Sequence, residues 1–156
     1  MKAKRIIIAI VAVSLCAGVF AYIGISADKE KWVSLNEIKS YENFSVDDIT
    51  EISLREAVDS TACVNFSDAD FIGEWKIYFK NIKLKYTGKD DNDINGGKKV
   101  IELKTNVGTA TFTFVDDGNE IVIDGRVYEI NSEVAFPFSE TYSSAKERHG
   151  EKRPWD

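Results

Sequence analysis

The sequence has few of the residues that enzymes most often use for chemistry. Its 156 residues include one histidine, His149, and two cysteines, Cys16 and Cys63. His149 lies in a polar C-terminal stretch in which nothing is expected to orient it as a base, so Ser-His-Asp and Cys-His arrangements are not predicted. The patterns H-E-x-x-H, C-x-x-C and G-x-S-x-G and the phosphate-binding loop are also absent. We therefore predict a protein that is not an enzyme, with no catalytic residues and no cofactor.

The shortage of cysteine also limits how the protein is stabilised. Cys16 lies in an apolar run and Cys63 in a separate strand-like stretch, Ala62–Phe66, so no disulfide is expected within the folded part. We expect Cys63 to be a buried, unreactive thiol. The domain must then depend on its hydrophobic core.

Basic residues are outnumbered after the first few positions. Three of the 20 Lys and Arg residues precede residue 28, and none of the 26 Asp and Glu residues does, so residues 28–156 carry a net charge of −9. This balance argues against nucleic acid as a partner, because phosphates require a basic surface. It also argues against docking on anionic lipid. The length is sufficient for one ordinary domain.

A run of 20 uncharged residues, Ile6–Ile25, is the most informative feature of the chain. At 1.5 Å per residue, about 20 apolar residues cross a hydrocarbon core of about 30 Å. Lys2, Lys4 and Arg5 precede the run, and basic residues keep the end that carries them in the cytoplasm. We predict a signal anchor over residues 1–27, which places the protein in the cell membrane as a single-pass protein with its domain outside.

Two alternatives to an uncleaved anchor fit the same residues. A cleaved signal peptide is compatible with Val19-Phe20-Ala21 and with Gly24-Ile25-Ser26, and would give a secreted protein. Lipidation at Cys16 is the other alternative, although Leu15 stands where a small residue usually precedes a lipoprotein cysteine.

Three further segments are predicted after the anchor. Residues 28–47 form a juxtamembrane linker with one or two helical turns or a stalk. Residues 48–138 form an extracytoplasmic α+β domain. Residues 139–156 form a polar C-terminal tail, either a short exposed helix ending at Gly150 or a disordered segment.

One amphipathic helix is predicted inside the domain. It is indicated by apolar residues at steps of three, four and three: Ile72, Trp75, Phe79 and Ile82. Ser67 is expected to cap it and to complete a capping box with Asp70. A long strand is the alternative, because residues 75–80 also nearly alternate.

The rest of the domain is predicted to be β-structure. Alternation of apolar and polar residues predicts strands over Ile49–Leu54 (an edge strand), Ile82–Tyr86, Val100–Thr105, Thr109–Phe114, Ile121–Ile123 and Arg126–Ile130. Hairpin loops are predicted at Asn106–Gly108 (three residues), Asp116–Asn119 and Asp124–Gly125, the last as a type I′ turn. The predicted fold is an antiparallel β-meander of about five to six strands packed on one amphipathic helix.

The segment Asn81-Ile82-Lys83-Leu84-Lys85 and the closing stretch Ile123–Ile130, with the short strand and acid-capped helix before them, resemble a group of small bacterial domains. These are uncharacterised extracytoplasmic domains of Gram-positive bacteria, held by one membrane span or by a lipoprotein anchor. The resemblance covers about residues 48–132. It implies a location and a fold class, and it implies no catalytic residues.

Residues 91–102, here named the calcium-type loop, fit the pattern D-x-[DN]-x-[DN]-G-x5-E. The candidate calcium ligands are Asp91, Asp93, Asn95 and Glu102. An EF-hand has helices on both sides, whereas strands are predicted here, and Lys98 and Lys99 oppose a divalent cation. The alternative is a polar hairpin loop with a turn at Asn95–Gly96. We therefore predict no metal site, with calcium as the alternative.

Three functions follow as hypotheses, in order of preference. The first is a non-enzymatic domain that binds a protein or an envelope component through a sheet edge or an exposed face. The second is a calcium-binding extracytoplasmic module. The third is an enzyme with an unrecognised carboxylate site, although the acid pairs Asp47–Asp48 and Asp116–Asp117 are expected to be solvated.

Overall fold

The computed structural model describes residues 31–57, 62–94 and 97–152. The chain divides between Lys31 and Trp32 into two units. The predicted anchor over residues 1–27 lies outside the described residues, and none of the helices within them is long and apolar enough to cross a membrane. The second unit begins at Trp32.

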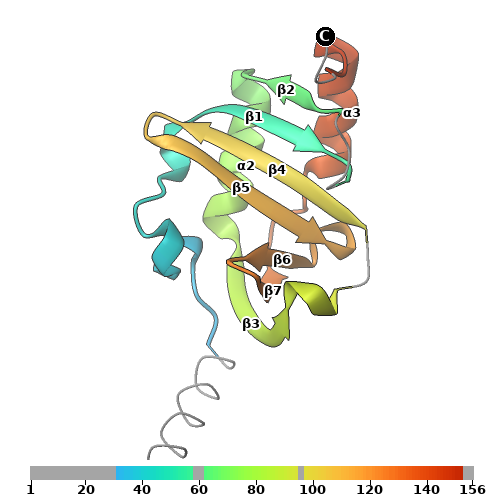
Figure 1. Ribbon diagram of the computed structural model, residues 1–156. Coiled ribbons are helices and arrows are strands. Elements are labelled where there is room, and N and C mark those ends of the chain that lie inside the picture. The colour runs from blue at the N-terminus through green and yellow to red at the C-terminus, as the bar shows by residue number, and fades with distance from the viewer. Residues whose placement is uncertain (1–30, 58–61, 95–96, 153–156) are drawn as a thin grey trace, which may run out of the picture. The chain divides into compact units, whose positions relative to one another are not determined.

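The domain is built on one antiparallel sheet of seven strands in the order β2-β1-β4-β5-β6-β7-β3 (Figure 1). The strands are β1 (Ile49–Arg55), β2 (Val64–Phe66), β3 (Lys83–Asp90), β4 (Lys98–Thr105), β5 (Gly108–Val115), β6 (Glu120–Ile123) and β7 (Arg126–Asn131). Two α-helices, α2 (Ala69–Asn81) and α3 (Phe138–His149), accompany it. The predicted α+β class and the antiparallel sheet are confirmed, with seven strands in place of five to six and two helices in place of one.

Only β4 to β7 form a meander. β1 pairs with β4, and β3 pairs with β7 at the opposite end of the sheet. The predicted edge position of Ile49–Leu54 is therefore wrong, because β2 covers the outer side of β1. Alternation could not reveal this, since a strand with one buried face alternates whether it lies at an edge or inside the sheet.

Two of the three predicted hairpin loops had different outcomes. Asp124 has φ 52° and Gly125 has φ 74°, which confirms the type I′ turn between β6 and β7. The loop between β4 and β5 has two residues and not three, because Thr105 already pairs with Gly108. The Thr105 hydroxyl donates to the Gly108 carbonyl at 3.0 Å and fixes this tighter turn.

Helix α2 buries one face against the sheet, as its spacing predicts. The buried residues are Phe71, Ile72, Trp75, Tyr78 and Phe79. The predicted cap is wrong: the helix begins after Asp68 and not after Ser67, and no side chain caps it. The Asp68 carboxylate instead contacts Arg148 and His149 of α3.

Helix α3 forms where a polar tail was predicted, and it ends at Gly150 (φ 73°) as expected. It is not simply exposed, because four side chains on one face are buried: Phe138, Thr141, Tyr142 and Ala145. Helix α3 packs on β2, and a bridge between Cys63 and Lys152 follows it. The sequence concealed this stripe because threonine and alanine do not mark an apolar face.

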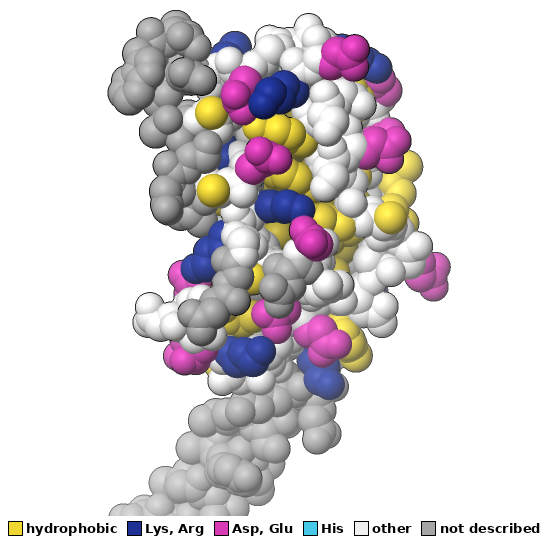
Figure 2. All heavy atoms as spheres, turned by 90° about the vertical axis from the view of Figure 1, so that its right-hand side faces the viewer, with side chains coloured by type: hydrophobic (Ala, Val, Ile, Leu, Met, Phe, Trp, Pro, Cys, Tyr) yellow, Lys and Arg dark blue, Asp and Glu magenta, His cyan; other side chains and the backbone are white. Residues whose placement is uncertain are grey.

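The face of the molecule on the α3 side mixes acidic and basic side chains, with hydrophobic groups between them (Figure 2). No sign of charge dominates this view. Such a surface creates no extended field for a polyanion or a polycation.

The described part of the predicted linker, residues 33–46, packs on the core. Three 3₁₀ turns lie here: η1 (Leu35–Glu37), η2 (Lys39–Tyr41) and η3 (Val46–Asp48). Val33 bridges Leu84 of β3, and the Ser40 hydroxyl donates to Asp124 at 2.6 Å. Lys80 of α2 pairs with Asp47 at 2.5 Å. The segment therefore crosses from β3, past the β6–β7 turn, to α2.

Candidate functional site

The calcium-type loop joins two strands, β3 and β4, through the turn η4 (Asp91–Asp93). Asp91 Oδ1 accepts a bond from Lys98 Nζ at 2.6 Å, and Asp93 Oδ2 accepts one from the Asp90 amide at 3.1 Å. Glu102 pairs with Arg55 of β1. Asn95 lies outside the described residues.

The candidate acids of this loop therefore have protein partners that compete with a metal ion. Within the ranges that the structure describes, no three His, Cys, Asp or Glu side chains are gathered where they would hold a cation. Lys98, the first of the two lysines in the loop, forms an ion pair with Asp91 at the first position of the motif.

In the two acid pairs, Asp47, Asp48 and Asp117 lie at the surface. Asp47 and Asp117 each bind a lysine, Lys80 and Lys99, at 2.5 and 2.7 Å. The hydrogen bond from that lysine is the main reason that the pKa of each of these carboxyl groups lies below its ordinary value. Nothing is described for the side chain of Asp116. A raised pKa, as a general acid needs, is not found for Asp47 or Asp117.

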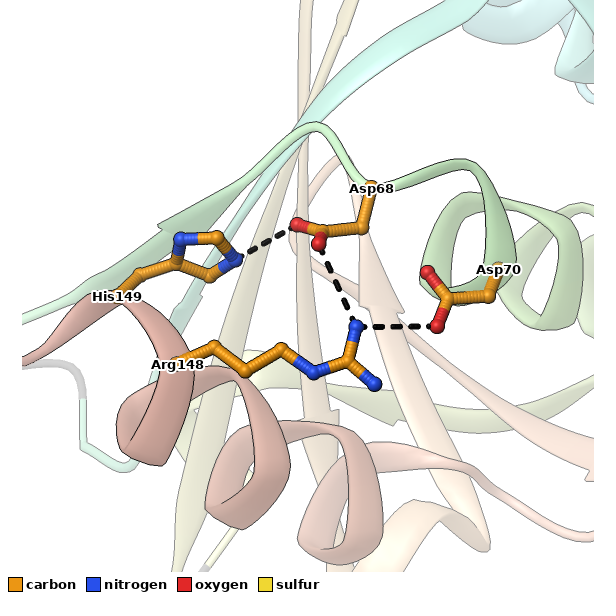
Figure 3. A network of polar contacts seen from close by, with 4 residues as sticks. All are labelled: Asp68, Asp70, Arg148 and His149. Atoms are coloured by element: carbon orange, nitrogen blue, oxygen red, sulfur yellow. Dashed lines mark hydrogen bonds and ion pairs between the residues drawn. The ribbon is translucent and has the colours of Figure 1, made fainter.

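A polar network, here named the α3 clamp, joins the end of α3 to the start of α2 (Figure 3). His149 Nε2 lies 2.7 Å from Asp68 Oδ2. Arg148 Nη1 donates to Asp68 at 3.4 Å and to Asp70 at 3.1 Å, and its guanidinium group lies 4.4 Å from the centre of the Phe71 ring. The expectation that nothing orients His149 is wrong, because Asp68 does.

The α3 clamp has a clear structural role. Its acids lie at the N-terminus of α2 and its bases in the last turn of α3, where the two helix dipoles favour them. The hydrogen bond from Arg148 is the main reason that the pKa of Asp70 lies below its ordinary value. An imidazole–carboxylate pair needs a nucleophile and a substrate pocket for catalysis. None of the clamp residues lines either of the two hollows described below.

The first hollow, here named the uncharged groove, lies between η2 and the β4–β5 hairpin and has a volume of about 360 Å³. Its lining residues share the absence of charge: Ser40, Tyr41, Asn43, Phe44, Thr105, Val107, Gly108, Thr109, Ala110 and Thr111. This is unusual in a domain whose surface carries many acids. Residues 40–44, which include part of η2, form one wall of the groove. This part of the chain lies at the left of Figure 1.

The walls of the uncharged groove are fixed by contacts on both sides. The Tyr41 ring stacks on Phe112 with centroids 4.9 Å apart, and Phe44 meets Phe112 edge-on at 5.9 Å. The Tyr41 hydroxyl donates to the Thr111 carbonyl at 3.3 Å. Burial, with a smaller effect of Asp124, raises the pKa of Tyr41, so this hydroxyl stays a neutral donor. Val107, at the hairpin tip, is 81% exposed.

The second hollow has a volume of about 300 Å³ and shares Phe44 with the uncharged groove. It is lined by Ser34, Leu35, Asn36, Phe44, Val46, Phe79, Lys80 and Ile82. Its one charged group, Lys80, is paired with Asp47, and the Ser34 hydroxyl accepts a bond from Lys83 at 2.6 Å. This hollow offers mainly core side chains to a ligand.

Comparison of the chain with protein-family models, curated proteins and solved structures found no match. The resemblance to small extracytoplasmic domains therefore stays an expectation from the sequence. The groove itself was not predicted: its walls come from residues 40–44 and 105–111, which are far apart in the chain, and no sequence pattern links them.

Proposed function

We propose that this protein is a non-catalytic binding domain, held on the outer side of the cell membrane by its N-terminal segment, and that it binds a protein partner through the uncharged groove. The apolar run Ile6–Ile25 behind three basic residues supports the location. The observation that carries the proposed site is the groove between η2 and the β4–β5 hairpin, with ten uncharged lining residues in an acidic domain.

The chemistry of the groove favours binding over catalysis. Its lining contains hydroxyl, amide and aromatic groups, and no carboxylate, imidazole, thiol or amine. Its volume lies at the lower end of the range for ligand pockets. Exposed aromatic and apolar groups beside neutral polar groups are common in the centre of protein–protein interfaces.

Site-specific photocrosslinking in intact cells tests this function. A photoreactive residue at Val107, which lines the groove at the hairpin tip, is compared with one at Ile77, which is 54% exposed on α2 and lines neither hollow. We expect a discrete crosslinked protein from position 107 only, and its loss when Tyr41→Ala removes part of the groove wall. The same products from both positions would contradict the assignment.

Location is tested in the same cells. We expect the chain to fractionate with membranes, and protease added to spheroplasts to digest it after about residue 28. Recovery of the intact chain in the cytosol would refute the proposed location.

A further inference from the structure

The uncharged groove contains a stretch of strand edge that none of the described strands covers. β5 pairs with β4 along its whole length, but β6 pairs only with residues 113–115 of β5. β6 ends at Ile123, where the type I′ turn leads into β7. Among the residues that the structure describes, residues 108–112 of β5 thus have no strand partner on the β6 side.

The pairing of the β4–β5 hairpin tells which backbone groups face this open edge. Thr105 and Gly108 flank a two-residue loop, so they form a hydrogen-bonded pair. Backbone groups alternate in direction along a strand, so Thr109 and Thr111 point away from β4. The bond from the Tyr41 hydroxyl to the Thr111 carbonyl agrees with this direction. The Thr109 N–H and C=O groups and the Thr111 N–H group are left facing the groove.

The two outer edges of the sheet are protected in ways that this inner edge is not. At β2, Cys63 and Lys152 exchange backbone bonds of 2.9 and 2.8 Å. At β3, Val33 bridges Leu84. The β3 strand also carries three lysines, Lys83, Lys85 and Lys89, which discourage pairing with another chain. Residues 108–112 contain no lysine and no proline.

We propose that the uncharged groove binds an extended, uncharged peptide segment of a partner protein by β-strand addition to Thr109 and Thr111. This inference rests on the proposed function and names its mode. A peptide strand presents N–H and C=O groups that repeat every two residues, about 6.8 Å, which is the separation of Thr109 and Thr111 along β5. The segment is uncharged because no lining residue compensates a charge that becomes buried in the groove.

Two substitutions at one position separate backbone from side-chain recognition. Thr109→Pro removes the N–H group at an edge position, whereas Thr109→Val keeps it and removes only the hydroxyl. The probe is a fluorescent pool of capped hexapeptides composed of Val, Thr, Ser and Asn, and binding to the full chain is followed by anisotropy. We expect Thr109→Pro to weaken binding about tenfold and Thr109→Val by less than about twofold.

Amide hydrogen exchange on the unmodified chain supplies a measurement that depends on no substitution. The N–H groups of Thr109 and Thr111 should exchange more slowly when the peptide pool is present, while exposed amides of α3 should not change. A hexapeptide pool containing Lys and Asp should bind more weakly than the neutral pool.

Several outcomes would overturn strand addition. Equal losses in Thr109→Pro and Thr109→Val would assign recognition to the side-chain hydroxyl. Binding of a neutral β-linked oligosaccharide pool in place of the peptides, or no peptide binding, would also overturn it. If crosslinking from Val107 nevertheless persists, the proposed function stands and only its mode fails. If neither peptide binding nor crosslinking from Val107 is observed, the groove is not the binding site.

Discussion

One methyl group added in the turn after β5 should destabilise the fold strongly. Gly118 has φ +92°, and a Cβ atom at this position would lie 2.4 Å from Cγ and Cδ1 of Phe136. Phe136 has little room to move, because its ring stacks on Phe114 at 4.7 Å and on Phe138 at 5.9 Å. Gly118→Ala therefore combines backbone strain with a clash against a packed ring.

The two contributions can be estimated and separated. A left-handed conformation costs a residue with a Cβ atom about 1–2 kcal/mol, and overpacking costs about 1–3 kcal/mol. Gly125 is the matched control, since it has φ +74° but no atom within 4 Å of the added Cβ. We expect Gly125→Ala to lose only about 1–2 kcal/mol of unfolding free energy, and Gly118→Ala about 2–5 kcal/mol.

Urea unfolding of the full chain, followed by tryptophan fluorescence, measures both variants, because Trp75 is fully buried in the core. A loss in Gly118→Ala no larger than that in Gly125→Ala would refute the close packing of Phe136 over this turn.

Three further predictions concern single groups. Tyr78→Phe should leave the unfolding free energy unchanged or raise it by up to about 1 kcal/mol, since the Tyr78 hydroxyl is buried and has no hydrogen-bond partner among the described residues. Tyr142→Phe, which loses a 2.6 Å bond to a carboxylate, should lower the unfolding free energy by about 1 kcal/mol in the same urea assay. The hydrogen bond from Arg148 lowers the pKa of Asp70 in the folded state. The contribution of Asp70 to stability is therefore present above its ordinary pKa, near 3.9, and is lost as the pH falls through the lowered value. Asp70→Asn should reduce the unfolding free energy at pH 7 and make it depend less on pH in the acid range. The calcium-type loop should bind calcium weakly or not at all in titration calorimetry, because its acids are paired with basic groups and an amide.

Each of these has a clear contrary result. A larger loss in Tyr78→Phe than in Tyr142→Phe would mean that the Tyr78 hydroxyl has a partner. An unchanged acid limb in Asp70→Asn would mean that the α3 clamp does not contribute to folding. Calcium binding with a dissociation constant below about 10⁻⁵ M, abolished by Asp91→Ala, would favour the alternative function, a calcium-binding module.

Local features of the fold were predictable from the sequence, because local chemistry decides them. Asp124–Gly125 supplies the two positive φ angles of a type I′ turn, and the steps of three and four in α2 fix its buried face. The position of β3 beside β7 was not predictable, since alternation says which face of a strand is buried and nothing about its neighbour.

The candidate sites depended even more on distant contacts. His149 and Asp68 are 81 residues apart, so the α3 clamp had no local pattern beyond acids at one helix start and bases at another helix end. The open edge of β5 exists because β6 has only four residues and ends before it reaches residues 108–112. Residues 40–44 form the opposite wall of the groove, and Tyr41 bonds to Thr111 across it. Such an edge is a property of the whole sheet and leaves no mark on residues 108–112 themselves.

Amide hydrogen exchange of the full chain, with and without an envelope extract that contains the crosslinked partner, tests the central claim most directly. The account predicts slower exchange at residues 40–44 and 105–111, which form the walls of the uncharged groove. The α3 clamp and the calcium-type loop should keep the exchange rates of the free protein. Protection confined to either of those two regions, with the groove unchanged, would contradict the account.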